Sequence, residues 1–427
     1  MTVYRCQYAW LPDGVQSDVC VSVVDGRISS VGGSVPDAVG LPGLTLPGFA
    51  NSHSHAFHRA LRGRTHHHRG TFWTWRDLMY AVAERLDPDS YYRLARAAYA
   101  EMVLAGVTCV GEFHYLHHAP GGVRYRDPNA MGEALAAAAA EAGIRITLLD
   151  TLYLQSSVDA KPLAGPQLRF GDGSLQGWTD RVAALQPQPH SLVGAAIHSV
   201  RAVPADALAD FSFAGPVHAH VSEQVAENEA CQAFHGCTPI ELLSRHDVIG
   251  PQFTAVHATH LTPGDVHRLS GATACFCPTT ERDLGDGIGP AQVLKAAGVR
   301  LTLGSDSHAV IDLIEEARAL ELNERLATQE RGHFAQEELL AAATVDGHRS
   351  LGWTDAGTLA TGQRADLVTV SLDSVRTAGV EPGGVLMAAT AADINQVMVD
   401  GRIVVRDGRH LSVDAAQELK EAVCALF

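Results

Sequence analysis

Two histidines separated by one residue, His53 and His55, follow an apolar run early in the chain. Alternate residues of a β-strand point to the same face, so both imidazoles can reach one metal ion. His220 and Asp306, at the ends of two later apolar runs, add a nitrogen and an oxygen donor. Three imidazoles and a carboxylate, with a position left for water, are typical of a catalytic zinc ion, and they suit iron(II) as well. A structural zinc site would need a closed ligand set, usually with cysteine, and no cysteine stands at these positions, so we expect one catalytic zinc per chain.

A glutamate, Glu223, lies three residues after His220 in the segment HVSEQ. In a dry pocket, a carboxylate can take a proton from water and return it to a leaving nitrogen. The alternative is a glutamate in the first turn of a helix, where the helix dipole favours negative charge. The position of Glu223 three residues after the candidate metal ligand His220 favours the proton-transfer role.

The elements that position these residues are indicated by an alternation of apolar strand-like runs with helical segments. Three helix-to-strand joints carry a glycine, Gly106, Gly143 or Gly298, which is the residue that commonly ends a helix. This pattern predicts a closed parallel (β/α)₈ barrel over residues 49–361. The eight predicted strands are LPGFANSHSH, VTCVGEF, IRITLLDTLY, LVGAAIHSV, PVHAHVSE, TAVHATH, ATACFCPTT and VRLTLGSD.

Polar and titratable residues gather where these predicted strands end. Active sites of such barrels lie at the C-terminal ends of the strands, so we expect the side chains to converge on one small volume. The residues concerned are His53, His55, Glu112, His114, His198, His220, His257, Thr279, Thr280 and Asp306.

The two ends of the chain resemble each other. Residues 21–33 and 397–409 both read as a strand, an Asp-Gly turn and a second strand, which is a strong hairpin signal. Residues 362–373 add another alternating strand. We therefore predict a small β-sandwich assembled from residues 1–48 and 362–427.

Composition limits the function classes. The chain is 46% hydrophobic and has no apolar run long enough to cross a membrane, and its formal net charge of −16 argues against nucleic acid. No signal peptide is visible, so a cytoplasmic location is expected. Eight scattered cysteines without a CxxC pair indicate buried, reduced thiols. The run His66-His67-His68 lies in a polar stretch and is expected to be a solvated loop.

The sequence resembles the amidohydrolase superfamily and, within it, the formimidoylglutamate deiminase family. The resemblance is carried by NSHSHAFHRA, FWTWRDLMY, GEFHYLHH, IHSVRAV, HVSEQ, VHATH, TTERDLGDGIGPA and LGSDSH, over about residues 46–330. It implies zinc-dependent hydrolysis of N-formimino-L-glutamate to N-formyl-L-glutamate and ammonia, a step of histidine breakdown. Binuclear barrels of this kind usually bridge two metals with a carboxylated lysine. Because Lys161, Lys295 and Lys420 do not end strands, a single metal is favoured.

The resemblance also assigns roles to residues. It implies that His53, His55, His220 and Asp306 are the zinc ligands, that Glu223, His257 and Asp306 act on the water and substrate, and that Arg76, Tyr115, His198 and Arg201 hold the glutamate moiety. The family commonly has glutamine where this chain has His58, which is expected near the substrate. Arginine forks suit the two carboxylates of such a substrate, which a protein of net charge −16 would otherwise repel. Barrels of this type often dimerise, so we expect a homodimer.

Two alternatives share this ligand set or fold. Another deaminase of the superfamily, acting on a purine, pyrimidine or related heterocycle, would keep every metal residue, and an aromatic stacking pocket in place of paired arginines would favour it. A barrel that had lost its metal and become an interaction protein would lack a ligand, and none is missing here.

Overall fold

The eight predicted barrel strands are confirmed in the computed structural model, which describes residues 1–33, 35–66 and 70–427. They form one parallel sheet in chain order, from β5 to β12. A single bridge between Ser54 and Asp306 joins its two edge strands, so the barrel is nearly closed. The strands are β5 (Phe49–Ser54), β6 (Val107–His114), β7 (Arg145–Leu152), β8 (Ser191–Ile197), β9 (Val217–Val221), β10 (Phe253–His257), β11 (Thr273–Phe276) and β12 (Arg300–Leu303).

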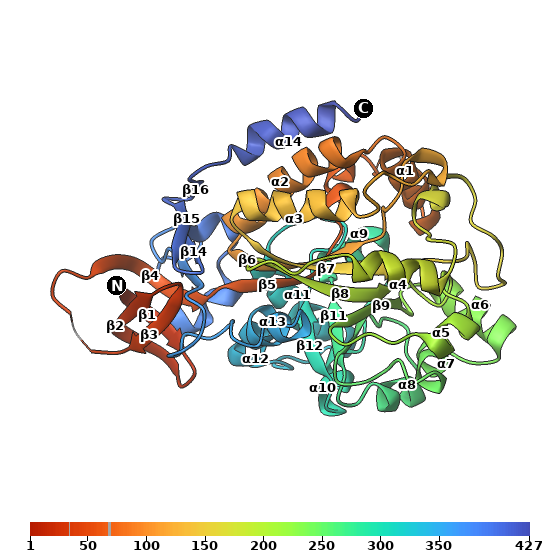
Figure 1. Cartoon of the computed structure of the whole chain (residues 1–427). Coiled ribbons are helices and arrows are strands. Elements are labelled where there is room, and N and C mark those ends of the chain that lie inside the picture. Colours follow the sequence, from red (N-terminus) through yellow and green to blue (C-terminus); the bar gives the residue numbers. More distant parts are fainter. Residues whose placement is uncertain (34, 67–69) are drawn as a thin grey trace.

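Helices surround the barrel (Figure 1). Apolar residues of the helices, such as Leu94, Leu135 and Leu313, lie in the main buried core, and the predicted glycine caps lie where the helices end. Gly143, for example, has a φ of 75° directly after α3, a left-handed conformation that glycine adopts without steric cost. The helices are α1 (Phe72–Ala83), α2 (Pro88–Leu104), α3 (Ala130–Ala142), α4 (Leu175–Ala183), α5 (Ala205–Asp210), α6 (Val225–His235), α7 (Pro239–Arg245), α8 (Pro263–Arg268), α9 (Pro278–Leu284), α10 (Ala291–Ala296), α11 (Leu313–Thr328), α12 (Gln336–Ala343), α13 (Val345–Ser350) and α14 (Ala415–Cys424).

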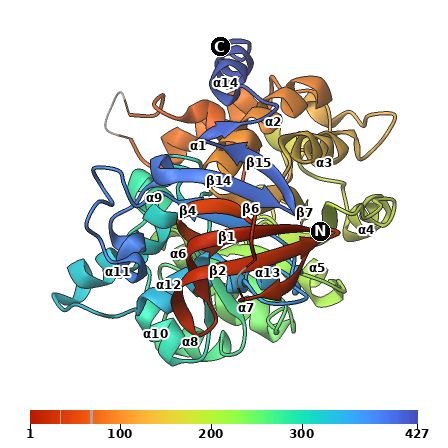
Figure 2. The ribbon, with the colours of Figure 1, turned by 90° about the vertical axis from the view of Figure 1, so that its left-hand side faces the viewer.

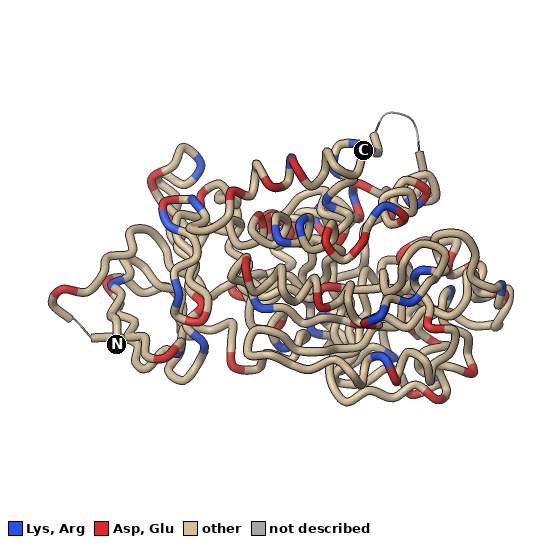
Figure 3. The backbone as a smooth tube through the Cα atoms, turned by 45° about the horizontal axis from the view of Figure 1, so that its top comes forward, with Lys and Arg blue, Asp and Glu red and all other residues tan. Residues whose placement is uncertain are grey.

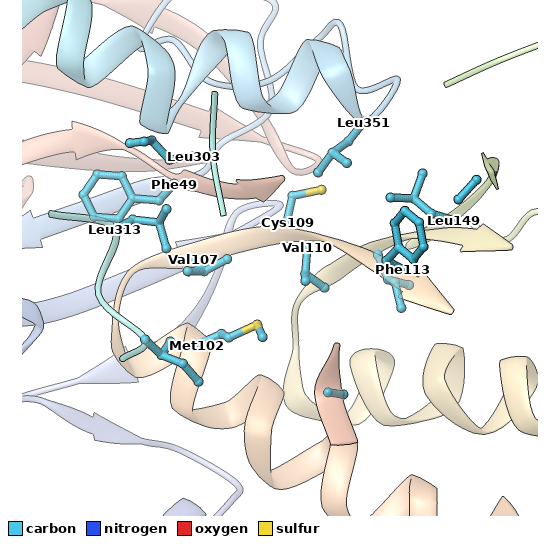
Figure 4. Close-up of a cluster of buried hydrophobic side chains, with 14 of the residues drawn as sticks. Phe49, Met102, Val107, Cys109, Val110, Phe113, Leu149, Leu303, Leu313 and Leu351 are labelled. Atoms are coloured by element: carbon cyan, nitrogen blue, oxygen red, sulfur yellow. The ribbon is translucent and has the colours of Figure 1, made fainter. Parts of the chain in front are cut away.

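The N-terminal end of the barrel is sealed by the chain that follows α13. Leu351 is fully buried there, and its backbone carbonyl accepts a hydrogen bond from Thr147 Oγ1 at 2.7 Å. Trp353 Nε1 donates to the same hydroxyl at 3.0 Å. Figure 4 shows Leu351 with Cys109 and other buried apolar side chains around β6. Because this end is filled by protein, the opposite end is left for a site.

The two chain termini share one mixed sheet of eight strands, in the order β16-β15-β14-β13-β4-β1-β2-β3 (Figure 2). Both predicted Asp-Gly hairpins are present, with positive φ at Asp25-Gly26 and at Asp400-Gly401. A separate apolar cluster, which includes residues of β1, β2 and β14, packs within this unit. Its strands are β1 (Thr2–Leu11), β2 (Gly14–Val24), β3 (Arg27–Val31), β4 (Val39–Pro47), β13 (Leu367–Val370), β14 (Ile394–Val399), β15 (Arg402–Arg406) and β16 (Arg409–His410).

Acidic and basic residues are interspersed along the chain and do not form one basic tract (Figure 3). The C-terminal helix α14 packs against α2, where Glu418 lies 3.3 Å from Arg96. Among the residues that the structure describes, no helix is both long enough and apolar enough to span a membrane.

Candidate metal centre and active site

Three imidazole nitrogens and a carboxylate oxygen converge at the C-terminal end of the barrel. His220 Nε2 lies 3.1 Å from His53 Nε2 and 3.3 Å from His55 Nε2. Asp306 Oδ1 lies 3.2 Å and 3.4 Å from the same two atoms of His53 and His55. His53 lies on β5 and His220 on β9, whereas His55 directly follows β5 and Asp306 follows β12. All four are buried. The structure therefore brings together the four residues named as ligands from the sequence.

The protonation of this cluster suits a cation. His55 Nδ1 donates to the carbonyl oxygen of Phe113 at 2.9 Å, and His220 Nδ1 donates to that of His198 at 2.9 Å. Each of these rings therefore presents its other nitrogen, Nε2, to the cluster. Burial lowers the pKa of His53, His55 and His220, so the rings are neutral.

Asp306 supplies the negative charge of this cluster. Burial opposes its ionisation, but the neighbouring histidines, His53 first among them, hold its pKa below the usual range. Neutral imidazoles and an ionised carboxylate are the form in which these groups ligate metal. The donor set fits a divalent metal ion.

A glutamate-histidine pair adjoins this cluster. Glu223 Oε1 lies 3.8 Å from His257 Nε2, and Asp306 Oδ2 lies 3.9 Å from the same nitrogen. Burial raises the pKa of Glu223 to about 7, with His257 and Arg201 opposing that rise. A carboxyl group with such a pKa can accept and return a proton near neutral pH.

His257 is held from behind by Glu281, a buried residue of α9 that sequence reasoning missed. Glu281 Oε1 lies 3.4 Å from His257 Nδ1 and accepts a hydrogen bond from the Cys277 backbone N–H at 2.9 Å. Burial lowers the pKa of His257, but Glu223, Glu281 and Asp306 outweigh it and raise that pKa well above its usual value. His257 thus carries a positive charge that faces Glu223.

The backbone itself aims two of these side chains. His257 has a φ of 68° and Asp306 has a φ of 40°. These are left-handed backbone conformations that residues other than glycine seldom adopt. Both residues stand where a strand leaves the sheet. Such strain persists where the surrounding structure imposes it, and it is common at functional sites.

A pocket opens over this centre, and helix α1 covers it. One helix supplies Phe72, Trp75, Arg76, Met79 and Tyr80 to the lining. Its position over the barrel had no signal in the sequence beyond the aromatic run FWTW. The other lining residues are His55, His58, Tyr115, Tyr153, Phe170, His198, Arg201, His220, Glu223, His257, Leu284 and Asp306.

Both arginines named from the sequence line this pocket. The Arg76 guanidinium lies 4.5 Å from the centre of the Trp73 ring and 5.4 Å from that of Tyr80, an arrangement that fixes a planar cation. Its Nε is buried without a hydrogen-bond partner among the described residues. Arg201 lies 3.5 Å from Glu227 and 5.9 Å from the Phe72 ring centre.

The remaining named residues also lie in the pocket. His58 Nε2 is 3.0 Å from the Tyr115 hydroxyl, and burial lowers the pKa of His58 to about 3, so the ring is neutral. The rings of Tyr115 and His198 are 5.4 Å apart. Burial, reinforced by Arg201 and Arg76, lowers the pKa of His198 well below its usual value. His58, Tyr115 and His198 thus form a neutral polar wall.

Some strand-end residues expected in the same volume lie outside the pocket. Glu112 accepts hydrogen bonds from Ser54 Oγ at 2.8 Å and from the Ala56 backbone N–H at 2.6 Å, and His114 packs against His117, with ring centres 4.8 Å apart. The reason is the period of two along β6: Phe113 packs against His220 inside the barrel, so both of its neighbours face outward.

Two further strand-end residues and the histidine run also lie elsewhere. Thr279 N–H donates to Glu316 at 2.9 Å, and the Thr280 hydroxyl lies 3.1 Å from that of Ser307. His66 is exposed and contacts Asp283 at 2.6 Å. His67 and His68, predicted to continue a solvated loop, lie outside the described residues.

A parallel barrel with potential metal ligands at the C-terminal ends of its strands belongs to the class of barrel enzymes. The family model described as "Amidohydrolase family" matches residues 44–404, and this chain belongs to that family.

Individual relatives agree with this assignment. The chain is 38% identical to formimidoylglutamate deiminase of Pseudomonas aeruginosa, with 96% of both chains covered. It is 29% identical to 5-methylthioadenosine/S-adenosylhomocysteine deaminase of Pelotomaculum thermopropionicum, with 96% of this chain and 94% of that protein covered. The crystal structure of an amidohydrolase from Brucella melitensis superimposes with a TM-score of 0.91 at 32% identity over 100% of both chains. The protein is a hydrolase of the amidohydrolase type that acts on C–N bonds.

Proposed function

We propose that the enzyme hydrolyses N-formimino-L-glutamate to N-formyl-L-glutamate and ammonia, as in histidine degradation. The observation that carries this proposal is the presence of Arg76 and Arg201 in the same pocket as the metal-ligand cluster. Two guanidinium groups are the expected partners of a substrate with two carboxylates. The likeness to the Pseudomonas deiminase supports the same substrate.

His53, His55, His220 and Asp306 would hold one divalent metal ion, and we propose zinc. When bound, such an ion acts as a Lewis acid and lowers the pKa of water at its open position. Glu223 takes a proton from the attacking water as oxygen adds to the formimino carbon. It passes this proton to the imino nitrogen and then relays the second proton of the added water to the same nitrogen, so that the C–N bond breaks, ammonia leaves and the formyl group stays on the glutamate.

The other pocket residues orient and shield the reaction. His257, held by Glu281, places a positive charge beside Glu223 and favours the carboxylate form that accepts a proton. His58, Tyr115 and His198 offer hydrogen bonds to the rest of the substrate. The aromatic rings of α1 exclude water, which strengthens each electrostatic contact inside. We further propose that the enzyme acts in the cytoplasm as a homodimer.

A second candidate is deamination of a heterocycle, and the aromatic lining favours it. Phe72, Trp75, Tyr80, Tyr153 and Phe170 could stack on a planar ring. The likeness to a methylthioadenosine deaminase supports the same possibility. However, a neutral heterocycle would offer no carboxylate to Arg76 or to Arg201.

Ammonia release decides between the two candidates. We would incubate the zinc-loaded enzyme with N-formimino-L-glutamate, N-formimino-glycine, S-adenosylhomocysteine and 8-oxoguanine, and identify each product by mass. Release from N-formimino-L-glutamate with N-formyl-L-glutamate as product is expected. Release from a heterocycle alone would reject the proposal.

A further inference from the structure

A glutamate in the first turn of α6, Glu227, is buried four residues after Glu223, which precedes the helix. Only 3% of its surface is exposed, whereas Glu229, two residues further on, points to solvent. Burying a carboxylate is costly unless it is paired, so this position requires a partner.

That partner is Arg201. Glu227 Oε1 lies 3.5 Å from Arg201 Nε, and both carboxylate oxygens of Glu227 are buried without a hydrogen bond among the described residues. Arg201 Nε is likewise buried and without a hydrogen bond there. The two groups thus face each other at a distance slightly too long for a full hydrogen bond.

The charges of the two groups depend on each other. Burial lowers the pKa of Arg201. Glu227, and after it Glu223, raises that pKa, and the net effect of all neighbours is a raised pKa. Burial raises the pKa of Glu227, while Arg201 lowers it. Glu227 therefore interacts electrostatically with an arginine that lines the pocket.

The geometry has a consequence for substrate binding. An arginine can grip a carboxylate side-on through Nε and one terminal nitrogen, or end-on through its two terminal nitrogens. Here Nε faces Glu227, so the end-on grip is the one left for a ligand in the pocket. We propose that Glu227 is a positioning residue that fixes Arg201 for an end-on grip of a substrate carboxylate beside Glu223. This inference rests on the proposed function.

The first test compares Glu227→Gln with Glu229→Gln in the metal-loaded enzyme. Both variants remove one negative charge from α6, but only Glu227 faces Arg201. For N-formimino-L-glutamate we expect Glu227→Gln to raise KM about 10- to 100-fold, the range for losing a charged contact. We expect kcat to change far less, metal content to stay constant and Glu229→Gln to match the wild type. Wild-type KM in Glu227→Gln would overturn the inference.

A double-mutant cycle separates positioning from general structural support. If Glu227 acts through Arg201, adding Glu227→Gln to Arg201→Ala should raise KM less than about threefold further. A full additional loss in that background would show that Glu227 acts elsewhere and would contradict the inference.

Binding of glutarate, measured by calorimetry, gives a readout that does not depend on turnover. We expect the wild type to bind this dicarboxylate and Glu227→Gln to bind it about 10- to 100-fold more weakly. An enzyme that binds glutarate in this manner but does not hydrolyse N-formimino-L-glutamate would reject the proposed function and keep the inference. A wild type without affinity for glutarate, or a variant with wild-type affinity, would overturn the inference.

Discussion

His55 and His220 face each other through Nε2 at 3.3 Å, while the Nδ1 of each ring donates to a backbone carbonyl. Neither Nε2 then carries a proton, so two lone pairs point into the same small volume. Two lone pairs this close repel each other unless a cation lies between them. The carboxylate of Asp306, 3.4 Å from His55 Nε2, supplies negative charge that would balance part of the charge of such a cation. The site is built to be filled by a metal ion.

The purified protein should therefore hold about one zinc ion per chain. His220→Ala should lose this metal because it removes one of the four donors, whereas His267→Ala, at an exposed position on α8, should keep it. Elemental analysis of both variants tests the expectation. Two tightly bound metals in the wild type, or full activity without any, would be incompatible with a mononuclear site.

Glu223→Gln should keep the metal and lose about 10²- to 10⁴-fold in kcat, the usual contribution of a positioned acid-base group. The amide has nearly the same shape but cannot accept the proton. Metal content and steady-state kinetics, measured on the same preparation, separate this loss from a loss of metal. If kcat stayed within a few-fold of the wild type, Glu223 would have no role in proton transfer.

Arg76→Ala should weaken substrate binding by roughly 2–5 kcal/mol, on the order of 30- to several-thousand-fold in KM. Arg76→Lys should recover little, because lysine keeps the charge but lacks the planar fork. Asp77→Asn, an exposed neighbour on α1, is the matched control. N-formimino-glycine lacks the side-chain carboxylate, so it should be a poor substrate for the wild type as well. Near wild-type efficiency of both Arg76→Ala and Arg201→Ala would exclude dicarboxylate recognition.

Stability should fall as the pH falls from about 6.5 to about 4. Burial, reinforced by nearby arginines, lowers the pKa of His117 and of His348 to about 4, whereas an unfolded histidine binds its proton near pH 6.5. Within this window the unfolded chain binds more protons than the folded chain. Each histidine therefore reduces the free energy of unfolding by up to about 1.4 kcal/mol per pH unit as the solution is acidified.

Urea unfolding of metal-free protein at several pH values measures this effect. His117→Gln keeps a donor that can reach the carbonyl oxygen of Thr151, which His117 Nε2 contacts at 3.0 Å, and it removes the titrating group. The stability difference between wild type and variant should therefore change with pH across the window. A constant difference would show that His117 does not titrate as described.

Much of the fold could be predicted from local signals. Several barrel strands, such as β7 and β12, are runs rich in apolar residues, and glycines such as Gly143 mark where helices end. The spacing of His53 and His55 predicts two imidazoles on one face of a strand without any knowledge of tertiary contacts. The paired Asp-Gly turns likewise predicted hairpins at both ends of the chain.

Contacts between segments that are distant in the sequence could not be predicted from such local signals. Nothing in the sequence connects His257 with Glu281, because their contact depends on how α9 follows β11. The strand period alone leaves open which face of β6 lies inside the barrel, and the structure places Phe113 inside and Glu112 and His114 outside. The aromatic cover over the pocket depends on the docking of α1, which local sequence does not determine.

The most direct test of the account is the ratio of kcat/KM for N-formimino-L-glutamate to that for S-adenosylhomocysteine, measured with the zinc-loaded wild type. Two arginines and a proton-transferring glutamate around one metal site should make the formimino dicarboxylate the better substrate by at least about 10²-fold, since S-adenosylhomocysteine has a single carboxylate and must lose at least one of the two grips. A ratio below one, with ammonia released from the heterocycle, would contradict the assignment and leave a heterocycle deaminase built on the same metal site.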